Sequence, residues 1–274
     1  MRGVAREPQR ITSLGNERVK AIRALEMRKE RRETGLFVAE GASILATARD
    51  AGFAPVTLVR LAGPVDGEFQ RSLVSWASGC GAEVLEVSEA VLAKLAAKDN
   101  PQTMLSVFRQ RFVPLPDPAA VASGDTWVVL EEIRDPGNLG TILRTVDAVG
   151  GAGVVLVGTC CDPYARETVR ATMGSIFTVP VARAGAEEIA RWLAAWRGDV
   201  VGTHLRAPHD FRDVRYAGPV ALVMGREGPG LSDAMAGRCT RLVKIPMAGT
   251  LDSLNLAVAT ALTLYQIRGP ALRL

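Results

Sequence analysis

Apolar and polar residues alternate in two patterns over residues 16–108, and each pattern predicts a different secondary structure. Short apolar runs predict strands, whereas apolar positions repeated every three or four residues predict helices with one buried face. The predicted strands are 36–40, 55–60, 82–87 and 104–108, and the predicted helices are 16–33, 42–50, 67–78 and 88–97. Gly35 is expected to end the first helix as its C-cap, because glycine readily adopts a left-handed conformation. Strands alternating with helices predict a small α/β domain.

The segment 112–124 interrupts this alternation. It holds three prolines within five positions, at Pro114, Pro116 and Pro118, followed by small residues. Proline removes a backbone donor and disfavours helix in the preceding residue, so we expect a stiff, extended connector. The predicted organisation is a domain at 1–111, a linker at 112–125 and a second domain at 126–274.

The alternation resumes after the connector and predicts a second α/β unit. Its predicted strands are 126–130, 154–157, a short strand ending at Pro180, 199–203, 220–224 and 242–245. Its predicted helices begin near Asn138 and Asp162 and span 186–196 and 254–265. The last helix is almost entirely apolar and must be buried. Its start carries Asp252, Ser253 and Asn255. Either Asp252 or Ser253 merely caps the helix, or the three polar groups belong to a binding site, because helix N-termini favour anionic or oxygen-rich ligands.

The composition is that of a soluble globular protein, with 48% hydrophobic and 23% charged residues among 274. The four cysteines form no C-x-x-C pair, and the two histidines, His204 and His209, have no partner at zinc-ligand spacing. Neither a disulfide framework nor a metal site is therefore predicted, and both histidines are expected to be structural. The N-terminus lacks an apolar signal core, and the longest apolar helix is shorter than the roughly 20 residues that cross a bilayer. These features predict a cytoplasmic protein without a membrane partner.

The net charge of +4 indicates an anionic partner only weakly, but its location adds to the argument. Residues 1–35 contain ten basic and five acidic side chains. Clustered Lys and Arg residues attract a phosphate backbone, although the same pattern is typical of a solvated helix face. Both interpretations remain open on charge alone.

Polar residues gather at three predicted junctions between strands and helices. The first junction is 138–145, the second is 225–232, with glycines around Arg226 and Glu227, and the third is 245–255. Taken singly, each has an ordinary explanation: a helix cap, a surface arginine, a plain turn. The glycine-rich segment fits a nucleotide-binding phosphate loop poorly, because it lacks the closing Lys-Ser/Thr and is not G-x-G-x-x-G after a first strand. Its place at the carboxyl end of a buried strand favours a ligand site.

In this order and at these spacings, the three segments resemble the motifs of the SpoU (TrmH) family of RNA ribose 2′-O-methyltransferases, in the SPOUT superfamily. The N-terminal part resembles that family's substrate-binding domain, an RNA-binding fold similar to a ribosomal protein (L30e-like), through Leu36–Gly41 and Lys98–Gln102. The resemblance implies a C-terminal α/β domain with a deep trefoil knot and a smaller N-terminal α/β RNA-binding domain. It also implies S-adenosylmethionine as cofactor, bound in a bent pose, and a homodimer with active sites at the interface.

The resemblance further implies roles for individual residues. Residues expected to contact the methyl donor, largely through backbone groups, are Gly225, Ile245 and Leu254, with Thr203 and Met247 as weaker candidates. Residues at catalytic or substrate-ordering positions are Asn138, Arg144, Glu227, Ser253 and Asn255. Arg226 stands where the family often has a small polar residue, which leaves the substrate preference open.

Methyl transfer to a ribose hydroxyl requires in-line attack by oxygen, and the motifs offer no His or Lys as a base. Because arginine stays protonated in water, we expect Arg144 to bind the phosphate of the target nucleotide and to polarise its 2′-hydroxyl. Asn138, Ser253 and Asn255 would fix the ribose, and Glu227 would orient Arg144 or Asn138. The expected substrate is ribosomal RNA; the alternatives are a tRNA methyltransferase, a non-catalytic RNA-binding protein that retains the knotted fold, and a nucleotide hydrolase.

Overall fold

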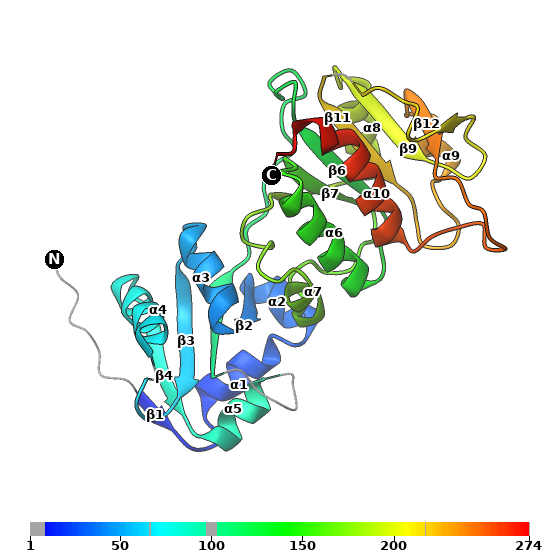
Figure 1. The fold of residues 1–274 in the computed structure, drawn as a ribbon. Coiled ribbons are helices and arrows are strands. Elements are labelled where there is room, and N and C mark those ends of the chain that lie inside the picture. The colour runs from blue at the N-terminus through cyan, green and yellow to red at the C-terminus, as the bar shows by residue number, and fades with distance from the viewer. Residues whose placement is uncertain (1–8, 66, 97–102, 217, 274) are drawn as a thin grey trace. The chain divides into compact units, whose positions relative to one another are not determined.

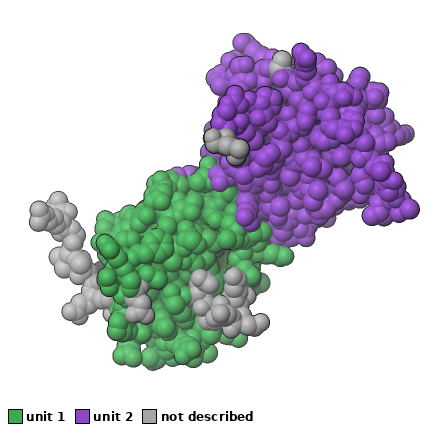
Figure 2. All heavy atoms as spheres, viewed as in Figure 1, with its two compact units in different colours: residues 1–110, 164–178 green, residues 111–163, 179–274 purple. Residues whose placement is uncertain are grey.

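Two β-sheets organise the computed structural model, which describes residues 9–65, 67–96, 103–216 and 218–273 (Figure 1). Each sheet belongs to its own compact unit (Figure 2). Unit 1 comprises the chain up to Gln110 together with Tyr164–Thr178, and unit 2 comprises Arg111–Pro163 and Val179–Leu274. The resemblance noted at Lys98–Gln102 lies outside the described residues.

Unit 1 contains a mixed sheet of five strands in the order β1-β4-β3-β5-β2. The strands are β1 (Gln9–Ile11), β2 (Leu36–Glu40), β3 (Pro55–Leu61), β4 (Glu83–Val87) and β5 (Met104–Arg109). The helices that precede the second unit are α1 (Glu17–Ala24), α2 (Arg28–Thr34), α3 (Ala42–Asp50), α4 (Gly67–Gly79) and α5 (Glu89–Leu95). β1 and β3 run parallel to β4, whereas β5 is antiparallel to both β2 and β3. The predicted α/β domain is confirmed, although its edge strand β1 was not predicted.

The single helix predicted over 16–33 is wrong, because the chain breaks into α1 and α2. The reason is Arg31, which is only 4% exposed. Its Nη1 atom donates to the carbonyl oxygens of Leu25 and Glu26, both at 2.8 Å, and these bonds hold the turn between the two helices. Met27, in the turn between the two helices, is 63% exposed. Gly35 ends α2 with φ 66°, as predicted for a C-cap.

The segment Tyr164–Thr178, which contains α7 (Arg166–Ala171), belongs to unit 1 although the sequence analysis assigned it to the second domain. Aromatic packing explains the difference. Phe37 of β2 lies 4.6 Å from Tyr164 and 5.8 Å from Phe177, measured between ring centroids. Arg166 also donates to the carbonyl oxygen of Leu95 at 2.6 Å. The segment therefore completes the hydrophobic core of unit 1.

Unit 2 contains a parallel sheet of seven strands in the order β10-β12-β9-β11-β6-β7-β8. The strands are β6 (Thr126–Glu131), β7 (Gly153–Val157), β8 (Val181–Ala184), β9 (Asp199–Thr203), β10 (His209–Asp210), β11 (Val220–Met224) and β12 (Arg241–Lys244). The helices are α6 (Pro136–Ala148), α8 (Ala186–Ala194), α9 (Asp233–Ala236) and α10 (Leu256–Arg268), followed by a short 3₁₀ turn, Gly269–Ala271. α8 and α9 bury their apolar residues on one face of the sheet, and α6 and α10 pack together on the other (Figure 1).

Three boundaries in unit 2 differ from the predicted ones. The predicted linker is part of unit 2, because Val113 donates to Val181 O at 3.0 Å and Pro116 O accepts from the Trp192 indole at 2.8 Å. The short strand predicted to end at Pro180 begins after it, since residues 172–178 form turns. Strand β10 lies between the strands predicted at 199–203 and 220–224, where no strand was predicted.

Among the described residues, none of the helices has the length and apolar character needed to cross a membrane. Nor does this part of the chain bring together three or more His, Cys, Asp or Glu side chains that could hold a metal ion.

Candidate functional site

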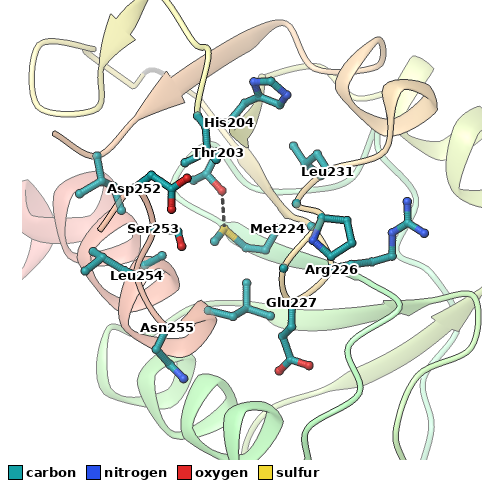
Figure 3. A pocket seen from close by; sticks show the side chains of 18 of the residues that line it. Thr203, His204, Met224, Arg226, Glu227, Leu231, Asp252, Ser253, Leu254 and Asn255 are labelled. Atoms are coloured by element: carbon teal, nitrogen blue, oxygen red, sulfur yellow. Dashed lines mark hydrogen bonds between the residues drawn. The ribbon is translucent and has the colours of Figure 1, made fainter. Parts of the chain in front are cut away.

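A pocket of about 740 Å³ opens at the carboxyl ends of β9, β11 and β12 (Figure 3). Parallel α/β sheets bind ligands at this edge. Nine of the ten predicted site residues line it: Asn138, Thr203, Gly225, Glu227, Ile245, Met247, Ser253, Leu254 and Asn255. The three segments singled out in the sequence therefore converge on one cavity.

The second segment, 225–232, forms a tight glycine loop against the pocket. Its backbone folds back on itself, because Arg226 and Gly230 exchange two N–H···O bonds of 3.0 Å. A Cβ atom on Gly225 would lie 2.1 Å from the carbonyl carbon of Gly230, so a side chain has no room there. Gly228 and Gly230 have φ values of 86° and 78°, which favour glycine. The loop thus lines the cavity with backbone at its glycines and with the side chains of Arg226, Glu227 and Leu231 (Figure 3).

A chain of amide and carboxylate groups joins all three segments. The side-chain amide of Asn138 donates to Glu227 Oε1 at 2.5 Å, and its oxygen accepts from Asn255 Nδ2 at 2.9 Å. Asn255 in turn caps α10, since its Oδ1 accepts from the backbone N–H groups of Ala257 and Val258. The orientation of the Asn138 amide is fixed because the donor faces the carboxylate.

Capping at two helices differs from the alternatives considered for the sequence. Asp135, not Asn138, caps α6, because its Oδ1 accepts from the backbone N–H of Asn138 at 2.6 Å. Asp252 and Ser253 precede α10 without capping it, and both line the pocket. The side chains of Asn138 and Ser253 are therefore available for a site.

Arg144 is the predicted site residue that the structure does not bring into the pocket. It lies six residues beyond Asn138 on α6, which is about 9 Å along the helix axis. Its side chain is exposed, and it forms no hydrogen bond or ion pair with the described residues. Within one chain, its guanidinium is free to meet an external group.

Several pocket residues were missed or underestimated by sequence reasoning. They are Asp135, His204, Leu205, Arg206, Met224, Leu231, Val243 and Lys244. Most stand at strand ends, and position at a strand end was the one feature that could have identified them. His204 Nδ1 accepts from the backbone N–H of Arg206 at 3.1 Å, which agrees with the structural role expected of it. Thr203 donates to Met224 Sδ at 3.6 Å and so turns its hydroxyl toward the pocket wall (Figure 3).

Cys161 lies beside the acidic end of this site without being suited to act as a nucleophile. Burial raises the pKa of its thiol to about 12, and the Cys160 thiol and the carboxylates of Glu227 and Asp135 add to the effect. The thiol is therefore protonated at neutral pH, whereas nucleophilic cysteines require the thiolate.

Comparisons with known proteins agree with this arrangement. Residues 125–265 match the model of the SpoU rRNA Methylase family, and residues 16–106 match an MRM3-like substrate binding domain. Together, the two matches cover most of the residues that form the two sheets.

Relatives of known description are similar over nearly the whole chain. A 23S rRNA (guanosine(2553)-2′-O)-methyltransferase of Bacillus subtilis is 28% identical, with 95% of this chain and 100% of that protein covered. A 23S rRNA (uridine(2479)-2′-O)-methyltransferase of Streptomyces viridochromogenes is 32% identical, with coverage of 94% and 91%. The crystal structure of an AdoMet-bound rRNA methyltransferase from Sinorhizobium meliloti has a TM-score of 0.89 at 42% identity, covering 97% of this chain and 99% of that one.

Proposed function

The chain belongs to the SpoU family of rRNA methylases, and from this membership we infer that it transfers a methyl group from S-adenosylmethionine to a ribose 2′-hydroxyl of ribosomal RNA. The observation that carries the inference is the convergence of three distant segments on one pocket, joined by the Asn138–Glu227 and Asn138–Asn255 hydrogen bonds. Two 23S rRNA methyltransferases among the relatives favour 23S rRNA as the substrate.

The pocket fits S-adenosylmethionine in size and in chemistry. Its volume of about 740 Å³ is within the range of small-molecule sites. Gly225 lines the pocket where its lack of a side chain lets the loop pack tightly, and Ile245, Met247 and Leu254 supply apolar surface for an adenine ring. These residues are the ones that we propose hold the cofactor, together with Thr203.

The bound cofactor supplies an electrophilic methyl group, and the protein residues align the ribose hydroxyl with it. Alignment of two reactants contributes on the order of 7–11 kcal/mol to catalysis. We assign this task to Asn138, Ser253 and Asn255, whose amide and hydroxyl groups can hydrogen-bond a ribose. Glu227 accepts from Asn138 and so holds its amide in one orientation. The alternative role for Glu227, orienting Arg144, has less support because Arg144 makes no contact with it.

Arg144 enters this scheme through the proposed homodimer. On α10, Val258, Leu262 and Tyr265 lie on one helix face and are 48%, 42% and 51% exposed. An apolar stripe of this kind favours a protein partner, and a second copy is the partner that the family resemblance implies. Because α6 packs beside α10, pairing through α10 would bring each Arg144 next to the other copy. There its guanidinium would bind the substrate phosphate and polarise the 2′-hydroxyl.

RNA docking is assigned to unit 1, which matches a substrate-binding domain over residues 16–106. The structure reduces the number of basic side chains available for this role. Arg31 is buried, and Arg18 and Lys20 form ion pairs with Glu83 and Glu17. The exposed Arg32 is still available on α2, whereas Arg2 and Arg6 lie outside the described residues. We expect RNA affinity to fall steeply with added salt, because binding to phosphates releases counterions.

The knot also remains a proposal. Its support is the strand order, in which β11 is inserted between β9 and β6, while α10 returns to pack against α6. Pulling the unfolded chain by its ends would test it, since a knotted chain stays shorter than its full contour length. The cytoplasmic location likewise stays a prediction.

The decisive experiment is to map ribose methylation across total RNA from cells with and without this protein. Loss of one 2′-O-methyl group in 23S rRNA is the expected result, and loss of a group in tRNA would favour the alternative substrate. Calorimetric titration with S-adenosylmethionine separates the enzyme from a non-catalytic RNA-binding protein. An absence of both binding and methylation would overturn the proposed function.

A further inference from the structure

Two consecutive carboxylates at the end of β6, Glu131 and Glu132, reach opposite ends of the glycine loop 225–232. Neither belongs to the predicted site, and neither lines the pocket. Both nevertheless contact the loop that forms one of its walls.

Glu131 holds the far end of the loop. Its Oε2 accepts from the backbone N–H of Ser232 at 3.0 Å, across 101 residues of sequence. Ser232 also caps α9, since its hydroxyl accepts from the backbone N–H of Met235 at 3.2 Å. The bond from Glu131 therefore fixes the point where the loop enters the next helix.

Glu132 holds the near end of the loop. Its Oε2 lies 3.8 Å from Nη1 of Arg226, the first residue after Gly225. Nε of Arg226 is buried and finds no acceptor among the described residues, so Glu132 is the ionic partner that the structure gives this side chain. The same Glu132 oxygen also lies 3.8 Å from Arg134, whose side chain is 69% exposed and lies outside the loop.

The backbone of Glu132 adopts a strained conformation, and the contact with Arg226 explains why. Its φ of 48° is unusual for a residue other than glycine. In a regular strand, successive side chains point to opposite faces, so two neighbouring residues do not reach the same loop. The left-handed turn at Glu132 ends the strand. Gly158 makes room for its side chain, because a Cβ there would lie 3.2 Å from Glu132 Cγ.

The two bonds between Arg226 and Gly230 close the loop on itself, but its glycines leave its placement dependent on outside contacts. Gly228 and Gly230 allow many backbone conformations, and Gly228 is exposed. Between them and Arg226 stands Glu227, which orients Asn138 at the site. A loop that samples several conformations must be ordered on binding, which weakens affinity.

We propose that Glu131 and Glu132 are positioning residues. Together they clamp the glycine loop by holding its two ends in place, and they thereby set the affinity of the pocket for the methyl donor and the orientation of Glu227. This inference rests on the proposed function, because it assigns the donor to the adjoining pocket.

The test compares Glu132→Gly with the wild-type protein. Glycine adopts a φ of 48° without strain, so the Tm should stay the same or rise. Loss of the contact should nevertheless raise the Kd for S-adenosylmethionine about two- to fivefold, because both side chains of this 3.8 Å ion pair are more than a third exposed and solvent weakens it. Hydrogen exchange at the backbone amides of 226–232 should become faster in the protein without ligand. If Glu132 only stabilised the fold, the Tm of Glu132→Gly should instead fall together with its affinity for S-adenosylmethionine.

Further variants identify the contact itself. Arg226→Ala should weaken binding as Glu132→Gly does, and the double variant should be no weaker than either single one, because both remove the same interaction. Arg134→Ala is the matched control: it removes a guanidinium at the same 3.8 Å distance but outside the loop, and should leave affinity unchanged within twofold. Glu131→Ala should weaken binding, and Glu131→Gln, which keeps an acceptor for Ser232, should restore it.

Two results would overturn the clamp: unchanged affinity and exchange in Glu132→Gly, or an equal loss in Arg134→Ala. Failure of the proposed function is distinguishable, because then the wild-type protein itself would not bind S-adenosylmethionine. Hydrogen exchange would still decide the clamp in that case, since it requires no ligand.

Discussion

Gly225 has no space for a side chain, and this makes it a sharp test of the pocket. In Gly225→Ala, the new methyl group would lie 2.1 Å from backbone atoms of Gly230 and Leu231, so the loop must move. We expect a loss of about 1–3 kcal/mol in the free energy of unfolding, as for other overpacked sites. Because the displaced loop is a pocket wall, S-adenosylmethionine binding should be lost in calorimetric titration. Gly249→Ala is the control, since nothing lies within 4 Å of its position, and it should bind normally.

Asn138 lies in the first segment and forms hydrogen bonds with Glu227 of the second and Asn255 of the third. Asn138→Ala removes the donor to Glu227 and the acceptor for Asn255, so the alignment of the ribose that we propose for Asn138 would be lost. We expect kcat to fall about 100-fold, the loss associated with small misplacements of reacting groups. Affinity for S-adenosylmethionine should change little, because the cofactor contacts come from other residues. Single-turnover methylation of rRNA, with a separate binding titration, would measure both effects.

Glu227→Gln provides a graded comparison for this prediction. The glutamine oxygen can still accept from the Asn138 amide, but without the negative charge that strengthens the hydrogen bond. Its kcat should therefore lie between those of the wild-type protein and Asn138→Ala. A glutamine variant less active than Asn138→Ala would contradict the positioning role and indicate that the charge itself takes part in the reaction.

Helix α10 carries the prediction about assembly. Leu262 lies at the centre of its apolar stripe and is 42% exposed. If this stripe is the dimer contact, Leu262→Glu would bury an unpaired charge between copies, which is strongly unfavourable. We expect the variant to be monomeric by light scattering and to lose methylation activity, because the proposed active site needs both copies.

The matched control for α10 is Phe69→Glu on α4, which adds the same charge at an apolar side chain that is 46% exposed. It should leave the oligomeric state unchanged. A wild-type protein that is monomeric at all concentrations, or a dimeric Leu262→Glu variant, would exclude α10 as the contact.

Helices and strands were predicted best where a periodic apolar pattern was long and uninterrupted. The buried face of α6, with Leu139, Ile142 and Val146, followed the expected spacing. The prediction failed for the first helix because the buried Arg31 binds carbonyls in the turn, and an arginine in a basic segment gives no sequence indication of burial. Helix starts were also misplaced: Asp135 and Asn255 proved to be the caps, while neighbouring polar residues offered equally good alternatives.

The periodic apolar pattern could not predict which distant segments contact each other. Asn138 and Asn255 are 117 residues apart, and only the resemblance to a family placed them at one site. The same limit applies to Tyr164–Thr178, which joins unit 1 through Phe37 although its neighbours in sequence belong to unit 2. Local patterns predict elements, but the choice of packing partner depends on the shape of the assembled core.

At the scale of the whole molecule, the proposed role of Arg144 has two forms: it acts either on the pocket of its own chain or on that of a second copy. Arg144 lies outside the pocket that contains Asn138, which favours action across the proposed dimer. Mixing the two inactive variants Arg144→Ala and Asn138→Ala, after unfolding and refolding together, would separate the two cases. Random pairing makes about half of the dimers mixed, and in a symmetric dimer each mixed pair has one complete site if Arg144 acts across the interface.

About a quarter of wild-type activity should then return, whereas neither variant refolded alone should regain any. Recovery requires that both variants bind and fold normally, which their circular dichroism and dimer mass would establish beforehand. If the refolded mixture stays inactive while mixed dimers are present, Arg144 must serve its own chain. Its helix would then have to present the arginine to a phosphate about 9 Å beyond Asn138, roughly the reach of a nucleotide bound across α6.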